Sequence, residues 1–113
     1  MSRYLNVFEK ITKDMTKKYP NVEASQMFGR DCLKVNGKPF CLFFDGDMAF
    51  KLMGLNFQKA MVLKGSKLFD PAGSGKPMSG WVQIYISQAD KWARLAYAAM
   101  YFVENGKEEE DVY

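Results

Sequence analysis

Histidine is absent from this chain of 113 residues. Its absence removes the commonest general base and the commonest metal ligand of proteins, and it excludes Ser-His-Asp and Cys-His catalysis within one chain. Cysteine is also scarce, because two thiols are too few for a four-thiolate zinc site and a Cys₂His₂ site needs histidine as well. We therefore expect no catalytic residues, no bound metal and no cofactor, which argues against an enzyme.

Long apolar segments are absent too. No stretch approaches the roughly 18–20 residues that cross a bilayer, and the opening residues Met-Ser-Arg-Tyr-Leu-Asn lack the apolar core of a secretory signal. We expect no membrane partner and a cytoplasmic location. Hydrophobic residues make up 48% and aromatic residues 15% of the chain, which predicts one folded domain over residues 1–113.

Charge is divided unevenly along the sequence. Residues 1–103 hold 15 Lys and Arg but only 8 Asp and Glu, whereas residues 104–113 hold one Lys and five acidic residues. The body is therefore basic, and residues 104–113 form an acidic tail. A basic body attracts nucleic acid or acidic proteins, and the tail competes for the same surface. The alternative is that these charges serve only solubility.

Residues 3–19 are predicted to form a helix that stops before Pro20. Apolar residues recur there at helical spacing and form one stripe, which consists of Tyr4, Phe8, Ile11, Met15 and Tyr19. Cations project from the opposite side, and this candidate basic surface consists of Arg3, Lys10, Lys13 and Lys17. The surface would bind the phosphates of nucleic acid.

Residues 27–52 predict a three-stranded antiparallel meander. Leu33 and Val35 alternate with polar residues before Asn36-Gly37, which is a strong signal for a two-residue hairpin turn. Apolar residues alternate again on either side of Asp45-Gly46-Asp47, at Phe40, Leu42, Phe44, Met48, Phe50 and Leu52.

The strand register follows from this alternation. A two-residue turn pairs Leu33 with Phe40, and a three-residue loop at 45–47 pairs Leu42 with Phe50. Together these pairings place the apolar residues of all three strands on one face. A slip of one residue would turn every following side chain to the other face, so the pattern favours the three-residue loop.

The remaining elements are shorter. Residues 55–64 predict a helix with Asn56 as N-cap, and residues 66–80 predict a long loop with a short strand at 67–69. A strand at 81–86 precedes a last helix at 88–104, with Ser87 as N-cap. The order is α-β-β-β-α-β-α, which predicts an α+β fold with flanking helices on an antiparallel sheet built on the meander.

Several short motifs occur in an order that resembles a known family. They are Met27-Phe28-Gly29, Val35-Asn36-Gly37-Lys38-Pro39-Phe40, Phe50-Lys51-Leu52, Leu68-Phe69-Asp70-Pro71, Pro77-Met78 and Trp81-Val82. Over roughly residues 24–103 the sequence resembles the TfoX N-terminal domain family. The resemblance implies a secretion-chaperone-like α+β domain. The founding members regulate bacterial competence genes, so it also implies a regulatory or interaction module linked to transcription or competence, with no established catalytic residues.

The predicted register gives the cysteines a candidate role. It places Cys32 opposite Cys41, and Cys41 opposite Lys51, in one row across three strands. A nearby ammonium lowers the pKa of a thiol and raises its reactivity. The row is therefore a candidate redox sensor or enzyme site. The alternative is that both cysteines pack as small apolar side chains.

Two acidic or glycine-rich segments resemble functional sites only superficially. Gly73-Ser74-Gly75-Lys76 lacks the first glycine of a nucleotide-binding P-loop and has Pro77 where Ser or Thr is needed. An isolated anion site formed by its backbone N–H groups stays open. Asp45 and Asp47 are interpreted as turn residues rather than as acid and base.

The last helix carries a candidate protein interface. Arg94, Tyr97 and Tyr101 project from its outward side, and Arg and Tyr are enriched at protein interfaces. An ordinary amphipathic surface is the alternative. We therefore rank three hypotheses: a non-catalytic module that binds a protein partner or a second copy of itself, a nucleic-acid-binding module, and a thiol sensor or enzyme.

Overall fold

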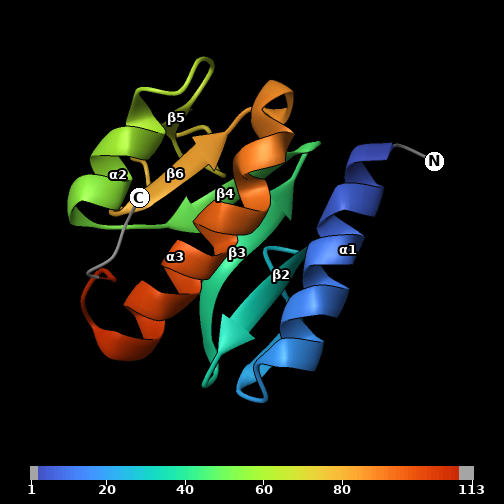
Figure 1. The fold of residues 1–113 in the computed structure, drawn as a ribbon. Helices are drawn as coiled ribbons and strands as arrows, with labels where there is room; N and C mark the ends of the chain where they lie inside the picture. The colour runs from blue at the N-terminus through green and yellow to red at the C-terminus, as the bar shows by residue number, and fades with distance from the viewer. Residues whose placement is uncertain (1–2, 110–113) are drawn as a thin grey trace.

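A six-stranded antiparallel sheet with helices on one face forms the protein (Figure 1). The computed structural model describes residues 3–109, with side chains described from Val7 onward. The sheet order is β1-β2-β3-β4-β6-β5. The elements are α1 (Arg3–Lys18), β1 (Val22–Met27), β2 (Arg30–Val35), β3 (Lys38–Phe44), β4 (Asp47–Lys51), α2 (Gly54–Met61), β5 (Lys67–Leu68), β6 (Trp81–Ile84), the 3₁₀-helix η1 (Ile86–Lys91) and α3 (Trp92–Asn105). This confirms the predicted α+β class.

The helices and the sheet enclose the larger core, which we call the helix-side core. The predicted stripe of α1 supplies three buried side chains, Phe8, Ile11 and Met15. The centre of α3 packs across β3 and β4, and Trp92, at its first turn, is fully buried. From the sheet, the helix-side core takes Leu33, Val35, Phe40, Cys41, Met48, Phe50, Leu52, Val82 and Ile84.

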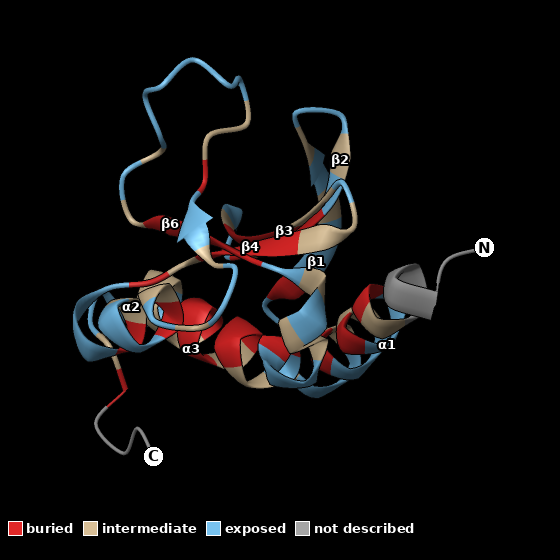
Figure 2. Ribbon diagram, turned by 90° about the horizontal axis from the view of Figure 1, so that it is seen from above, coloured by how far each residue is buried: buried red, intermediate tan, exposed pale blue. Residues whose placement is uncertain are grey.

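A second core lies on the opposite face of the sheet, where no described helix packs. It consists of Cys32, Leu42, Ala49, Phe69 and Trp81, with Met27, Phe44 and Met78 packed against it. Figure 2 shows the long loop between β5 and β6 on this side of the sheet, away from the helices. The loop returns to the sheet because Met78 N–H donates to the Phe69 carbonyl at 2.8 Å. Aromatic residues from the loop and strands therefore replace a helical layer.

The meander has four strands rather than three. Strand β1 pairs along its full length with β2, whereas the sequence predicts only that a strand begins near Met27. Its polar residues Glu23, Ser25 and Gln26 leave only Val22 and Ala24 in apolar alternation, which is too short a pattern to identify a strand. They are tolerated because β1 forms an edge of the sheet and most of its side chains are exposed or half-buried.

The register between β2 and β3 differs from the prediction after two pairs, Val35 with Lys38 and Lys34 with Pro39. Val35 lies opposite Lys38 as predicted, but Leu33 lies opposite Cys41 instead of Phe40. Phe40 is the extra residue of a β-bulge, and both Phe40 and Cys41 belong to the helix-side core. Pro39 directly precedes it, and proline within a sheet is confined to edges, strand starts and bulges. Beyond the bulge, every residue of β3 faces the opposite side from the one predicted.

The turn between β3 and β4 also differs from the prediction. It contains two residues, Asp45 and Gly46, with φ of 52° and 89°, and Phe44 lies opposite Asp47. A two-residue hairpin turn of this type needs positive φ at both positions, which Asp tolerates and Gly adopts freely. As a result, Leu42 lies opposite Ala49 rather than Phe50. Leu42 and Phe50 are both buried, but on opposite faces.

The predicted helix caps are also wrong. Asn56 lies inside α2, with a buried side chain, and the cap position of this helix is Met53. The last helix begins at Trp92 after the 3₁₀-helix η1, and Ser87 makes no cap hydrogen bond. Instead the Asp47 carboxylate accepts from Ile86 N–H at 3.1 Å and from Gln83 Nε2 at 2.8 Å. At the other end, Gly106 ends α3 in the left-handed conformation, with φ of 74°.

Candidate functional site: the groove between α2 and α3

A groove of about 310 Å³ lies between α2 and α3. Its floor is apolar and consists of Ala60, Leu63 and Leu95. Three cations, Lys59, Lys91 and Arg94, stand around it, accompanied by the single acidic residue Asp90. The groove therefore offers an apolar strip surrounded by excess positive charge.

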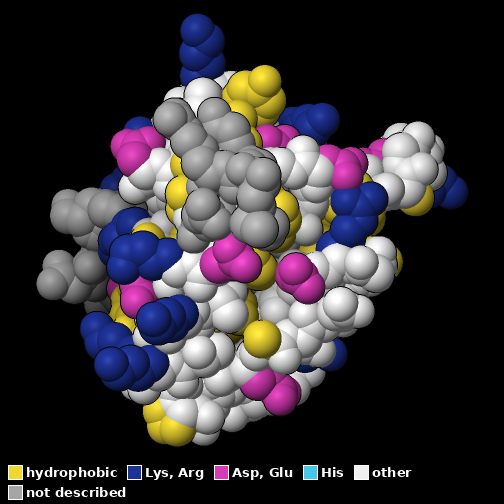
Figure 3. Space-filling view, turned by 90° about the vertical axis from the view of Figure 1, so that its right-hand side faces the viewer, with side chains coloured by type: hydrophobic (Ala, Val, Ile, Leu, Met, Phe, Trp, Pro, Cys, Tyr) yellow, Lys and Arg dark blue, Asp and Glu magenta, His cyan; other side chains and the backbone are white. Residues whose placement is uncertain are grey.

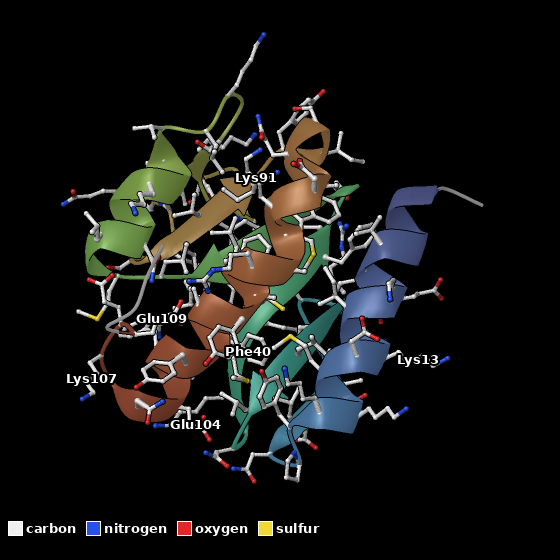
Figure 4. All side chains as sticks on the ribbon, in the orientation of Figure 1. Lys13, Phe40, Lys91, Glu104, Lys107 and Glu109 are labelled. Atoms are coloured by element: carbon white, nitrogen blue, oxygen red, sulfur yellow. The ribbon has the colours of Figure 1, made fainter. Side chains whose placement is uncertain are left out.

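Helical periodicity explains this arrangement. Lys91 and Arg94 are three residues apart and lie on one side of the chain as α3 begins, while Leu95 follows on the buried side of the same turn. On α2, exposed Lys59 stands directly before buried Ala60. Lys91 contacts the neighbouring Asp90 carboxylate at 3.4 Å. Figure 4 shows Lys91 near the start of α3 and Glu109, which follows the end of that helix, beside it on the side toward α2.

The acidic tail folds back onto this region. The Glu109 carboxylate lies 2.6 Å from the Arg94 guanidinium, and Glu109 is only 9% exposed. Arg94 is the charge partner of this buried carboxylate, and removal of either partner would leave the other charge uncompensated. Arg94 thus already holds one acidic side chain at the groove.

Glu108 caps the N-terminus of α2. Its carboxylate accepts from Leu55 N–H at 3.0 Å and from Asn56 N–H at 3.2 Å, two of the backbone groups that a helix leaves unpaired at its start. A Cβ atom on Gly54 would lie 2.1 Å from Glu108 Oε2. Glycine at position 54 therefore makes room for this carboxylate, as well as adopting a φ of +57°.

The predicted interface residues lie together beside the groove. Arg94 lies 5.8 Å from the ring centroid of Tyr97, and the rings of Tyr97 and Tyr101 are 6.4 Å apart. Tyr19, at the end of α1, lies 6.1 Å from Tyr97. Burial raises the pKa of Tyr97, and the Glu109 carboxylate raises it further. The structure thus brings Arg94, Tyr97 and Tyr101 together and connects them to the groove through Arg94.

The predicted thiol row does not form. Cys32 lies opposite Leu42, Cys41 lies opposite Phe50, and Lys51 lies opposite Trp81. The bulge at Phe40 turns Cys41 into the helix-side core, while Cys32 belongs to the second core. The two thiols therefore face opposite sides of the sheet, and Lys51 is not in their row.

The environment of the cysteines also opposes thiolate formation. Burial raises the pKa of Cys32, and the Lys34 ammonium offsets only part of this effect. Burial raises the pKa of Cys41 well above its usual range, and the nearby Cys32 adds to the shift. Both side chains are almost inaccessible, at 1% and 0% exposure. They pack as small apolar groups, which was the alternative interpretation.

The predicted basic surface lies on α1, away from the groove. Lys10, Lys13 and Lys17 are exposed, and Lys10 pairs with Asp14 at 3.2 Å. The side chain of Arg3 lies outside the described residues. Figure 3 views the side of the molecule that carries α1 and shows Lys and Arg side chains at several places, with Asp and Glu among them. Lys13 also lines a pocket between α1 and β1, where Glu9 and Asp31 accompany it.

The glycine-rich loop supplies its own anion. Asp70 accepts from Ser74 N–H at 3.2 Å and from Gly75 N–H at 2.8 Å. These are the N–H groups that an external anion would need. Asp45, in its hairpin turn, forms an ion pair with Arg30, while Asp47 caps η1. Both aspartates therefore have structural partners.

Among the described residues, no three Cys, Asp or Glu side chains gather as metal ligands would. No helix within residues 3–109 is long and apolar enough to cross a membrane.

Sequence reasoning missed four residues of this region: Lys59, Lys91, Glu108 and Glu109. The signal that could have found Glu108 and Glu109 was present, because an acidic tail follows a basic body. Their partners could not be identified without the fold, since Leu55 lies 53 residues from Glu108 in the chain.

Comparisons of the chain with protein-family models, curated proteins and solved structures return no match. The resemblance to the TfoX N-terminal domain and the likeness to secretion chaperones therefore stay predictions from the sequence.

Proposed function

We propose that the protein is a non-catalytic interaction module that binds an acidic segment of a partner protein in the groove between α2 and α3. The observation that carries this proposal is the pairing of Glu109 with Arg94 at the groove. Because Arg94 already binds the carboxylate of Glu109, a carboxylate of a partner protein is the ligand group that we expect the groove to bind.

Charge and polarity support an acidic rather than a neutral ligand. Lys59, Lys91 and Arg94 line the groove together with the acidic residue Asp90, and Arg94 also pairs with Glu109. A cationic rim speeds association with an acidic partner and rejects a basic one. The apolar floor would accept an aliphatic or aromatic side chain between the acidic residues, as the centre of a protein interface commonly does.

The proposed role agrees with the family resemblance. A regulator acts through its partners, so a cytoplasmic binding module fits the regulatory role that the TfoX-like motifs imply. The exposed cations of α1 give a nucleic-acid-binding module less support, since Lys10 is paired with Asp14 and the pocket that Lys13 lines also holds Glu9 and Asp31.

The test is a titration of the ¹⁵N-labelled full chain with a synthetic acidic peptide, Glu-Asn-Gly-Lys-Glu-Glu-Glu-Asp-Val-Tyr, which repeats residues 104–113. We expect the amide signals of Ala60, Leu63 and Leu95 to shift on binding. The variant Lys91→Glu should bind about tenfold or more weakly, because one charged contact is worth about 1.5–3 kcal/mol. Glu109→Gln should bind more tightly, since it weakens the internal competitor for Arg94.

The matched control is Lys17→Glu, which makes the same charge change on exposed α1. It should bind the peptide as the wild type does at 150 mM salt. The proposal fails if Lys91→Glu and Lys17→Glu lose the same affinity, or if the shifts fall outside the groove. Shifts of α1 signals with duplex DNA, and none in the groove with the peptide, would favour the nucleic-acid alternative.

A further inference from the structure

Strand β1 leaves one edge of the sheet unpaired. It pairs only with β2, and Met27 lies opposite Arg30 across a two-residue turn. Antiparallel pairing then directs the N–H and C=O groups of Glu23, Ser25 and Met27 toward β2, and those of Ala24 and Gln26 outward. Within residues 3–109, no hydrogen bond reaches the outward backbone groups of Ala24 and Gln26. Both residues are exposed.

The other edge of the sheet is protected, and β1 is not. Strand β5 has two residues and carries Lys67, and short, Lys-bearing edge strands resist pairing with other chains. Strand β1 has six residues, a regular register with β2, and no proline or lysine. The same sheet thus has one edge that blocks strand addition and one that permits it.

We propose that β1 pairs with β1 of a second copy, antiparallel about Ser25, so that one sheet runs through a homodimer. This register places Ala24 opposite Gln26 of the second copy, and Gln26 opposite Ala24 of the second copy. Each such pair exchanges two N–H···O bonds. A register centred on Ala24 would need the outward N–H of Val22, which already donates to the Tyr19 carbonyl at 3.0 Å.

Charge on α1 supports the same two-fold axis. Glu9 and Lys13 line the space beside Ala24 and Ser25, and they are four residues apart on one side of the helix. A two-fold axis through Ser25, perpendicular to the sheet, sets the two α1 helices antiparallel on one face. Glu9 of each copy then lies at the level of Lys13 of the other, so opposite charges face each other. The register also keeps Glu23 of one copy away from Glu23 of the other.

The test is analytical ultracentrifugation of the full chain over a concentration series. We expect a dimer of twice the 13.0 kDa chain mass. Ala24→Pro should raise the dissociation constant at least tenfold while leaving the monomer folded, because the N–H that it removes faces outward. Ala24→Ser keeps that N–H and is the matched control, with an unchanged dissociation constant.

Charge variants keep the test decisive if Ala24→Pro fails to fold. Glu9→Lys alone and Lys13→Glu alone should each weaken the dimer, because they place like charges across the axis. The double variant Glu9→Lys/Lys13→Glu should restore it. A wild-type chain that stays monomeric at 200 µM would overturn the proposal, as would a dimer that neither the proline nor the charge variants affect. The proposed peptide groove involves different residues, so its outcome is independent of this one.

Discussion

Single carboxylates hold distant backbone segments together in this fold. Asp47 accepts from Ile86 N–H, 39 residues away, and Glu108 accepts from Leu55 N–H, 53 residues away. Asp70, in contrast, serves Ser74, only four residues away. Sequence patterns detect a cap when a polar side chain directly precedes its helix, which is why Ser87 and Asn56 are the predicted caps. The carboxylates that act from other segments become identifiable only once the fold has brought them near.

Burial of Cys32 and Cys41 predicts that neither thiol reacts readily in the folded protein. Because burial raises the pKa of Cys32 and Cys41, alkylation at pH 8 should be slow in the folded protein and rapid only after unfolding. Unfolded thiols lose their protons near pH 8.5, whereas the buried thiols of the folded state keep theirs to higher pH. Deprotonation therefore favours the unfolded chain, and the free energy of unfolding should fall as pH rises past 8.5. Each thiol contributes a slope of up to about 1.4 kcal/mol per pH unit.

Urea unfolding at pH 7, 8, 9 and 9.5 measures this slope, with iodoacetamide labelling as the measure of reactivity. Cys41→Ala serves as the comparison, because it lowers stability at every pH but removes one thiol from the slope. Rapid labelling of the folded chain at pH 7 would contradict the buried placement of both cysteines.

Among the secondary-structure elements, the hairpins show where sequence patterns succeed and where they stop. Asn36-Gly37 determined its turn, and Val35 pairs with Lys38 as predicted. The bulge at Phe40 could not be predicted from alternation, because alternation assumes a regular ladder. Pro39 was the available clue, since proline within a sheet is confined to edges, strand starts and bulges. The predicted register is wrong by one residue at the bulge and again by one residue at the turn after Phe44. Leu42 lies between the two, so it faces the side opposite the predicted one. Met48 and Phe50 follow both, so the two errors cancel and these residues face the predicted side.

Helix α2 should depend on the tail for its stability. Glu108→Ala removes the carboxylate that satisfies Leu55 N–H and Asn56 N–H, so we expect unfolding to become easier by about 1 kcal/mol. Glu108→Gln should cost less, because it keeps an acceptor oxygen and loses only the charge. Urea denaturation monitored by far-ultraviolet circular dichroism measures both.

Glu104→Gln is the control for the charge of the tail. Glu104 lies in α3 and accepts from Asn21 Nδ2 at 3.3 Å, a bond that the glutamine oxygen can also accept. The free energy of unfolding of Glu104→Gln should stay within about 0.5 kcal/mol of the wild-type value. An equal loss in Glu104→Gln and Glu108→Ala would mean that the tail acts through net charge and not as a helix cap.

At the scale of the whole molecule, the class of fold was predictable and the arrangement of its two cores was not. Amphipathic helices at both ends of the chain and alternating strands between them imply α+β, as the sheet and helices confirm. The second core has no such signature. Leu42, Phe69 and Trp81 come from separate segments, and the sequence predicted the segment after Phe69 only as a long loop.

The two tryptophans report on the two cores separately. Trp92 is fully buried in the helix-side core, and Trp81 is 3% exposed in the second core. Because one sheet carries both cores, we expect one cooperative transition. Leu42→Ala should lower the free energy of unfolding by about 2–5 kcal/mol through lost burial and a new cavity. Fluorescence of Trp81→Phe and of Trp92→Phe, each compared with its own circular dichroism, should give coincident midpoints.

The bulge at Phe40 makes the length of this hairpin more important than its composition. Deleting one residue between Val35 and Leu42 would restore a regular ladder, and every residue of β3 after the deletion would exchange sides. Leu42 and Phe44 would then face the helices, and Cys41 and Phe43 would face the second core. A conservative substitution here alters one contact, whereas a single-codon deletion reassigns a whole strand. Over evolutionary time, descendants of this gene should therefore vary in residue identity along β3 far more readily than in the number of residues it contains.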